Sequence, residues 1–326
     1  MAVSSLDDQL TKYLTDAHAI EVQALAQMRA APGIAGDPEI ASAFSAHLAE
    51  TEEHERLVRE RLQARGAAPA SIKDLLGGLT GKGFVLFARS QPDTPGKLVT
   101  HAFSYEHMEL GAYEVLGQLA DRAADRTTAD MARKILQQEQ AMGQRLEALF
   151  ERAAEASLGE GTQEELERAL TAYLADAHAI EAQAIRLLER GPELAGSPSL
   201  ADAYREHLAG AQAHQELIAA RLQASGAGRS VLKDAALRLG ALNWGMLFQA
   251  QPDAPAKLAV FAYAFEHLEI AAYELLARVA RRAADPETGA EAQRIAGEER
   301  AAAERIRSLL GEALEGSLRE QSLGPR

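Results

Sequence analysis

The sequence predicts an all-α protein built from two tandem four-helix bundles, and three observations support this fold class. Of the 326 residues, 47% are hydrophobic but only 5% are aromatic. Ala, Leu, Glu, Gln and Arg, which form helices readily, are abundant, whereas the β-branched residues that favour strands are sparse. One long pattern also occurs twice along the chain, and this length is sufficient for two domains that each bury a core.

The repeat has a constant offset of 160 residues. The segment YLTDAHAIEVQAL at 13–25 returns as YLADAHAIEAQAI at 173–185. Likewise, QPDTPGKL at 91–98 returns as QPDAPAKL at 251–258. A period of this length indicates tandem domains and not a solenoid of short repeats.

The boundary between the copies lies in the segment EASLGEGTQEEL. Its two glycines are followed by Thr162 and, three residues later, Glu165, which is the pattern of a capping box that opens a helix. We therefore predict domains at 1–158 and 159–326. We expect the two copies to pack on each other as an intramolecular pseudo-dimer, with any higher oligomer left open.

Four segments of the first copy carry apolar residues at the helical period. They predict helices over about 5–30, 37–65, 95–122 and 126–153. The first ends at the helix-breaking pair Pro32 and Gly33. The connection over about 67–94 is too long for a tight hairpin, so we predict a crossover that contains a short extra helix, with Ser71 and Asp74 as its cap pair.

Composition excludes several classes of protein. The net charge of −14 would repel a phosphate backbone, so we expect no nucleic acid partner. No run of about 18 apolar residues is present, so we expect no transmembrane helix. The N-terminus lacks the pattern of a secretory signal and the chain has no cysteine, so we expect a cytoplasmic protein without disulfides or thiolate chemistry.

Carboxylates interrupt the apolar stripe of every predicted helix in the first copy. Glu21 stands in the first helix, Glu50 in the second, Glu106 with Glu109 in the third and Glu139 in the fourth. An isolated carboxylate in a bundle core costs several kcal/mol or takes up a proton, and a cluster costs more unless a cation lies within it. Proton sharing and pairing with Arg are the alternatives, but the stripes contain almost no Arg or Lys.

Two divalent ions would supply the missing positive charge. Carboxylate oxygens with one or two imidazoles suit iron or manganese. Such sites occur in four-helix bundles, with Glu from two helices and a Glu and His pair from each of the others.

The motifs DAHAIEVQAL, HLAETEEHERL and EHMELGAYE resemble the ferritin-like superfamily, in particular the stress-associated bacterial family of the YciE/YciF type. The resemblance covers nearly all of both copies and implies two tandem ferritin-like bundles. It implies that the metal ligands of the first copy are Glu21, Glu50, His54, Glu106, Glu109 and Glu139. The superfamily pattern is Glu-x-x-His. This chain instead has His47-x-x-Glu50 and Glu50-x-x-x-His54, and Met142 and Gly143 stand where a His after Glu139 would be.

Three further side chains are candidates for supporting roles. His18 lies three residues before Glu21 and is expected to orient it. His47 is either a ligand or a core histidine bonded to a carboxylate, because it shares a face with Glu50. Tyr113 is expected to pack in the core with its hydroxyl bonded to a carboxylate, and a redox role is the alternative.

The second copy retains most of these residues but not all. Its candidates, which we expect to form a degenerate second site, are Glu181, His214, Glu266, Glu269 and Glu299. Gly210 replaces Glu50, so the helix loses its carboxylate on that stripe. We therefore expect two iron or manganese ions mainly in the first copy, and weak, single or no occupancy in the second.

The resemblance implies a di-metal carboxylate protein that oxidises Fe(II) or consumes oxygen or peroxide in stress protection. The alternative is a non-enzymatic helical stress or scaffold protein in which metal is structural or absent. The loss of Glu50 from the second copy, with the other acids retained, fits this alternative.

Overall fold

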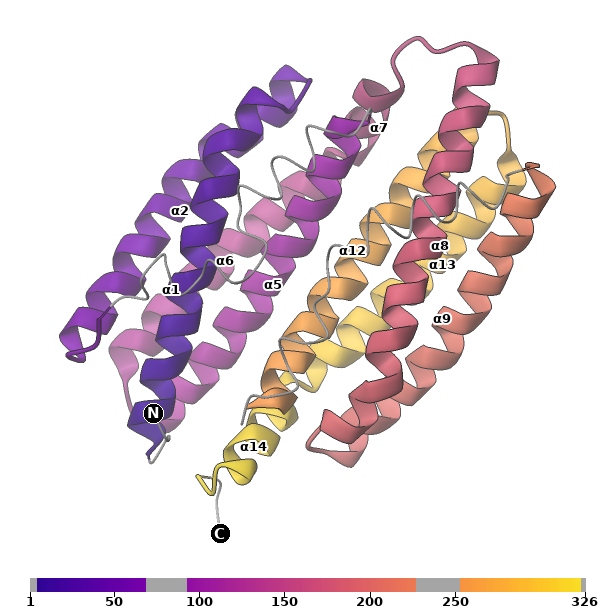
Figure 1. The fold of residues 1–326 in the computed structure, drawn as a ribbon. Helices are drawn as coiled ribbons and strands as arrows, with labels where there is room; N and C mark the ends of the chain where they lie inside the picture. The colour runs from indigo at the N-terminus through magenta and orange to yellow at the C-terminus, as the bar shows by residue number, and fades with distance from the viewer. Residues whose placement is uncertain (1–4, 69–92, 227–252, 324–326) are drawn as a thin grey trace. The chain divides into compact units, whose positions relative to one another are not determined.

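The computed structural model describes residues 5–68, 93–226 and 253–323, and these residues form α-helices joined by short turns (Figure 1). This confirms the predicted all-α fold class. The first copy consists of α1 (Leu6–Ala30), the 3-10 turn η1 (Ala31–Gly33), α2 (Pro38–Ala64), α5 (Thr94–Arg122), α6 (Arg126–Ala148) and α7 (Phe150–Leu158). The predicted helix ends agree with these bounds to within one or two residues, except at the end of the fourth helix.

The second copy repeats this order of elements. It consists of α8 (Gln163–Leu194), α9 (Pro198–Ala224), α12 (Ala254–Arg282), α13 (Pro286–Ser308) and α14 (Leu310–Glu320). The chain divides into two compact units, Met1–Ala153 with Leu318–Arg326, and Ala154–Ser317. We refer to them as the first and second unit.

Two helix ends show how local sequence sets the elements. The predicted capping box is confirmed: the Thr162 side chain accepts from the backbone N–H of Glu165, and the Glu165 carboxylate accepts from the N–H of Thr162. The fourth helix, predicted as one element to residue 153, is interrupted at Leu149, whose N–H bonds the carbonyl of Leu146 at 3.0 Å. The chain then restarts as α7 and buries Phe150 against Phe103, with ring centroids 5.2 Å apart.

Ion pairs at the helix ends establish the direction of each helix. Arg61, near the end of α2, pairs with Asp125 at the start of α6 at 2.7 Å. Arg65 bonds the Thr11 hydroxyl near the start of α1 at 3.1 Å. Therefore α2 runs antiparallel to both α1 and α6, and the short turn between α5 and α6 makes that pair antiparallel as well.

It follows that α2 and α5 run in the same direction, so the end of one and the start of the other lie at opposite ends of the bundle. The connection between them must span the bundle length, about 40 Å for a helix of this size. This agrees with the predicted long crossover. The short helix predicted inside it, with Ser71 and Asp74, lies outside the described residues.

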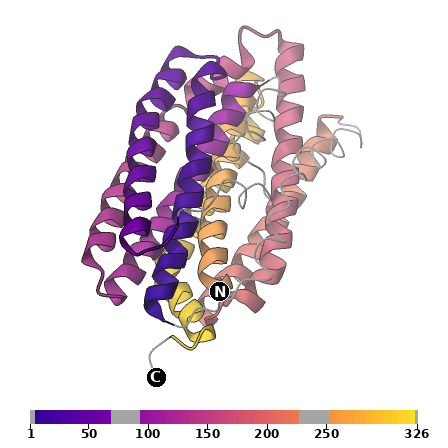
Figure 2. The same ribbon diagram turned by 60° about the vertical axis from the view of Figure 1, so that its left-hand side comes forward.

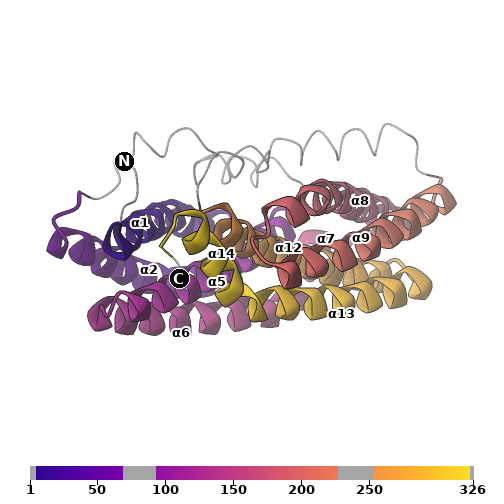
Figure 3. The same cartoon turned by 90° about the horizontal axis from the view of Figure 1, so that it is seen from below.

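Each unit is a four-helix bundle with the same neighbours. The helices α1, α2, α6 and α5 pack in that cyclic order, as do α8, α9, α13 and α12 (Figures 1 and 2). Seen from below, α1 and α6 lie on opposite sides of the first unit, and α8 and α13 on opposite sides of the second (Figure 3). In the described parts of the chain, no helix is both long and apolar enough to span a membrane.

Candidate metal centre

Side chains from all four helices meet in the core of the first unit. Helix α1 contributes one carboxylate, α2 contributes two imidazoles, α5 two carboxylates and α6 one carboxylate. None of these side chains is more than 1% exposed: Glu21, His47, His54, Glu106, Glu109 and Glu139. Buried carboxylates at this density require compensation by protons or by cations.

Five of the six side chains form two adjacent groups that share Glu139, and Glu109 belongs to neither group. In the first group, Nδ1 of His54 lies 2.7 Å from Oε1 of Glu139 and 3.8 Å from Oε1 of Glu21. In the second, Nε2 of His47 lies 3.2 Å from Oε2 of Glu106 and 3.3 Å from Oε2 of Glu139. The donor atoms of each group lie within 4.8 Å of one another, a spacing that can hold one ion. We name these groups the His54 subsite and the His47 subsite.

The seven-residue spacing of the two histidines explains why both reach the core. At 3.6 residues per turn, seven residues return to within about 20° of the same direction, about 10 Å further along the helix. The imidazoles of His47 and His54 therefore follow one another along the bundle axis in an edge-to-face arrangement, with ring centroids 6.3 Å apart. Each ring meets a different oxygen of Glu139, so this carboxylate joins the two subsites.

Glu50, which the resemblance made a ligand, does not join the cluster. Its side chain is 29% exposed, and its carboxylate lies 3.0 Å from Arg145 and 2.9 Å from Nδ1 of His47. Three residues rotate the side chain by about 60° from His47 around the helix. Glu50 thus stands on the flank of the buried stripe and contacts the outer nitrogen of His47, while the inner nitrogen faces the cluster.

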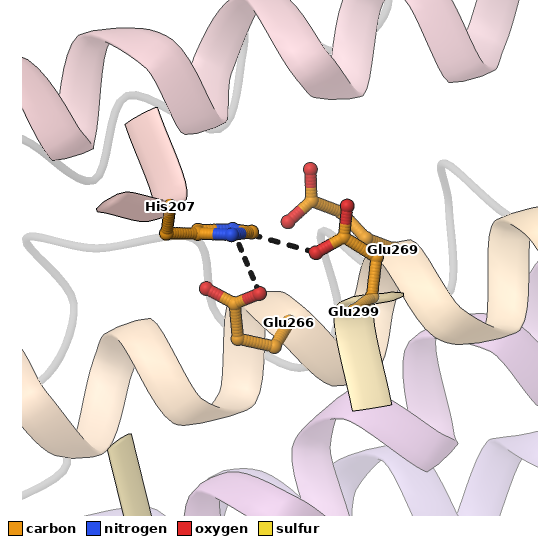
Figure 4. Close-up of side chains that lie close together, drawn as sticks. All are labelled: His207, Glu266, Glu269 and Glu299. Carbon is orange, nitrogen blue, oxygen red and sulfur yellow. Dashed lines mark ion pairs between the residues drawn. The ribbon is translucent and has the colours of Figure 1, made fainter. Parts of the chain in front are cut away.

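The second unit contains a similar arrangement, in which Glu269 also joins the group around His207. Nε2 of His207 lies 2.9 Å from Oε2 of Glu266 and 3.4 Å from Oε2 of Glu299, and Figure 4 shows both contacts with Glu269 alongside. Nδ1 of His214 lies 2.8 Å from Oε1 of Glu299 and 3.5 Å from Oε1 of Glu181. The second unit therefore has a His207 subsite and a His214 subsite that share one carboxylate.

This geometry removes the reason for expecting a degenerate second site. That expectation depended on Glu50 as a ligand, whose counterpart is Gly210. Since Glu50 points away from the cluster, its replacement deletes no member of the buried set. The residue pair that sequence reasoning undervalued is His47 with His207. A signal for it was present, because both copies keep two histidines seven residues apart while only one keeps the glutamate.

Tyr113 and His18, the other two candidates for supporting roles, lie in different surroundings. Tyr113 donates its hydroxyl to Oε1 of Glu21 at 2.5 Å, and Tyr273 donates to Glu181 at 2.5 Å in the second unit. His18 instead pairs with Glu55 of α2 at 3.0 Å and is not brought to the cluster. The expectation that His18 orients Glu21 thus finds no contact in the structure, because the ring turns toward the neighbouring helix.

The family comparison matches the chain twice, at residues 5–159 and 165–318, to a family described as "Domain of unknown function (DUF892)". The chain belongs to this family. The two matches coincide with the two halves that the internal repeat defines. No curated protein and no solved structure matches the chain.

Burial strongly perturbs the carboxyl groups of the first DUF892 domain. Burial, followed by the charge of Glu139, raises the pKa of Glu21 to about 8, and burial is also the largest cause that raises the pKa of Glu106 to about 8. Burial raises the pKa of Glu109 well above its ordinary value. In the absence of a cation, these acids therefore retain protons near neutral pH.

Glu139 and its histidines behave in the opposite way. Burial acts to raise the pKa of Glu139, but hydrogen bonds from His47 and His54 outweigh burial and hold that pKa below its ordinary value. Burial acts to lower the pKa of His47, but Glu106 and Glu139 outweigh it and raise the pKa to about 12. Burial acts to lower the pKa of His54, but Glu139 and Glu21 outweigh it and raise that pKa. In the metal-free first domain, an ionised Glu139 thus lies beside a protonated His47.

The donor set of each DUF892 domain fits divalent metal ions. Carboxylate and imidazole donors suit iron or manganese. Within the described residues, no hydrogen-bond donor reaches the buried Oε2 of Glu21, Oε1 of Glu109 or either carboxylate oxygen of Glu269. Oxygens that are buried and unsatisfied in a polar cluster are the atoms that an ion would coordinate.

Proposed function

We propose that each DUF892 domain of this chain binds a pair of divalent metal ions, iron or manganese, one in each subsite. The observation that carries this proposal is the position of Glu139, which offers one oxygen to the His54 subsite and the other to the His47 subsite. Glu299 occupies the same position between His207 and His214. A carboxylate shared in this way is suited to bridge two ions, as in the di-metal sites of four-helix bundles.

Different residues of the chain would hold each of the two ions. His54, Glu21 and Glu139 would bind one ion, and His47, Glu106 and Glu139 the other. Glu109, which is buried beside them with an unsatisfied oxygen, would complete the charge balance. We expected metal mainly in the first copy. We propose instead that both copies bind it, because both units present two subsites.

The reaction that we propose is oxidation of Fe(II), or consumption of oxygen or peroxide, in protection against stress. The resemblance of the sequence to the YciE/YciF-type ferritin-like family supports this class of reaction, as do the two adjacent subsites. A bound pair of ions would supply one-electron chemistry at two neighbouring positions. The chain's own residues would exclude bulk water, hold the ions and keep the protein acids close to them.

The alternative is a helical scaffold in which the acids share protons and bind no metal. The perturbed pKa values of the carboxyl groups favour it, because burial raises the pKa of Glu21, Glu106 and Glu109 toward neutral pH or beyond. Protons and the two imidazoles then balance the cluster without an ion. Metal content distinguishes this scaffold from the proposed centre.

The deciding experiment is metal analysis of the full chain after anaerobic loading with Fe(II) and removal of loosely bound ions. We expect about four tightly bound irons in the wild type, since each unit has two subsites. Glu139→Gln should remove the pair of the first unit and Glu299→Gln the pair of the second, each leaving about half of the iron. Addition of oxygen or peroxide should then produce a near-ultraviolet absorption change in proportion to the iron retained.

Asp130→Asn is the matched control, because Asp130 is an exposed acid on the same helix as Glu139 and pairs with Arg133. It should retain the full complement of iron. A wild-type chain that retains no iron while its helical content is unchanged would contradict the proposal and support the scaffold.

A further inference from the structure

The two units differ in what contacts the outer nitrogen of each histidine, although the same residue types occur in their inner clusters. In the first unit, Nδ1 of His47 bonds the carboxylate of Glu50 at 2.9 Å. In the second unit, the counterpart of Glu50 is Gly210, and no described side chain pairs with Nδ1 of His207. The His47 subsite therefore has an outer carboxylate that the His207 subsite lacks.

The other histidine of each unit shows the reverse difference. Nε2 of His54 contacts the neutral amide oxygen of Gln138 at 3.2 Å. Nε2 of His214 contacts the carboxylate of Glu298 at 2.7 Å. The outer carboxylate thus stands behind the His47 subsite in the first unit and behind the His214 subsite in the second.

Both outer carboxylates are held in place by an arginine. Glu50 lies 3.0 Å from Arg145, and Glu298 lies 2.5 Å from Arg294. The Glu50 side chain is 29% exposed and that of Glu298 is 49% exposed, so both pairs are partly exposed. The difference between the units is therefore one of position along the bundle axis.

An outer carboxylate makes an imidazole a stronger and better oriented ligand for a metal ion. By accepting the hydrogen of the outer nitrogen, it leaves the lone pair of the inner nitrogen directed at the ion and fixes the orientation of the ring. Its negative charge also strengthens the donor. Removal of such a partner typically lowers metal affinity about 10- to 100-fold.

We propose that Glu50 and Glu298 are positioning residues that make one subsite of each unit the tight one: the His47 subsite in the first unit and the His214 subsite in the second. This inference rests on the proposed function. It assigns the His54 and His207 subsites as the more labile positions. Each unit thereby holds one retained and one exchangeable ion, in opposite order along its bundle.

The test is the transfer of iron from the anaerobically Fe(II)-loaded full chain to an excess of a chromogenic Fe(II) chelator, followed by absorbance. In the wild type we expect two kinetic phases of equal amplitude. Glu50→Gln and Glu298→Gln should each move about one quarter of the iron from the slow phase to the fast phase, because each removes one outer carboxylate.

Two reciprocal variants add an outer carboxylate where the wild type has none. Gln138→Glu introduces an outer carboxylate behind His54, and Gly210→Glu introduces one behind His207. A side chain at position 210 has space, since the nearest atom to its Cβ would be Cε1 of His214 at 3.9 Å. Each gain variant should move about one quarter of the iron from the fast phase to the slow phase, an effect that a merely structural role would not produce.

The possible failures are distinguishable. A wild-type chain that binds no iron overturns both this inference and the proposed function. A chain that binds iron with unchanged phases in the two loss variants and the two gain variants overturns only the assignment of tight subsites. Circular dichroism of each variant establishes that its helical content is retained, and a gain variant that slows release cannot be explained by loss of folding.

Discussion

At the scale of single residues, the centre depends on how buried oxygens obtain partners. Glu21 lies fully buried on α1, and its Oε1 accepts from Tyr113 while its Oε2 has no hydrogen-bond donor in the described residues. Glu181 and Tyr273 repeat this arrangement. The tyrosine therefore bonds the same oxygen that faces the histidine of the cluster, and the other oxygen has no donor.

We predict that Tyr113→Phe destabilises the metal-free protein by about 1–3 kcal/mol, because a buried acceptor loses its donor. Tyr273→Phe should have a similar effect through the second unit. The measurement is the free energy of unfolding from urea titrations followed by circular dichroism. Wild-type stability in both variants would show that the Glu21 carboxyl group finds another partner at no cost.

At the scale of elements, helix ends and side-chain spacing position the cluster. The seven-residue spacing of His47 and His54 places both rings on the inner face of α2, whereas Glu50 stands on the flank of that face. Helix α8 brings Glu181 to its place in the second unit, and its start is defined by the capping box of Thr162 and Glu165. A defined start is important here because α8 follows directly on the connection between the copies.

We predict that Thr162→Ala lowers the stability of the second unit by about 1 kcal/mol, since an N-cap side chain is lost. The control is Thr171→Ala on the same helix, where the hydroxyl bonds only the carbonyl of Glu167 within the helix. Alanine should be tolerated there because it favours the helix. Chemical denaturation of the full chain checks both variants, and equal stability of the two would contradict the capping contribution.

At the scale of the whole molecule, the two units carry the same cluster twice, so its electrostatics affect the entire chain. In the first unit, burial raises the pKa of Glu21 and of Glu106 to about 8, and burial raises that of Glu266 to about 8 in the second. The ordinary value for these groups is 4.5. Between these values the folded state binds more protons than the unfolded state, so stability falls as pH rises.

We predict that the metal-free protein is less stable at pH 8 than at pH 6. The raised pKa of His47 acts in the same direction above pH 6.5, because its imidazolium is lost more readily on unfolding. Glu139 has a lowered pKa, so its contribution is already complete above about pH 5 and does not oppose the trend. Scanning calorimetry of the metal-free chain at both pH values measures this difference.

The metal-loaded protein should show the opposite trend over the same range. Divalent ions bind deprotonated imidazoles and carboxylates, so their affinity and the stability that they add increase with pH. Comparison of loaded and metal-free samples therefore separates the effect of the ion from that of the protons. Identical pH profiles in the two samples would indicate that no ion enters the cluster.

The sequence by itself determined the helical fold class, the two copies and all but one of the helix ends of the first copy, because periodicity, capping residues and an exact offset are local or repeated signals. It also identified Glu21, Glu106, Glu109 and Glu139 as buried acids, since each interrupts an apolar stripe.

The tertiary structure alone decided which side of α2 faces those acids. Residues three or four apart share a broad helix face, so spacing could not separate Glu50 from His47 and His54. Only the packing of α2 against α1 and α6 directs both imidazoles to Glu139 and leaves Glu50 with Arg145. For the same reason, only the packed bundle shows that the second unit, despite Gly210, retains the whole cluster.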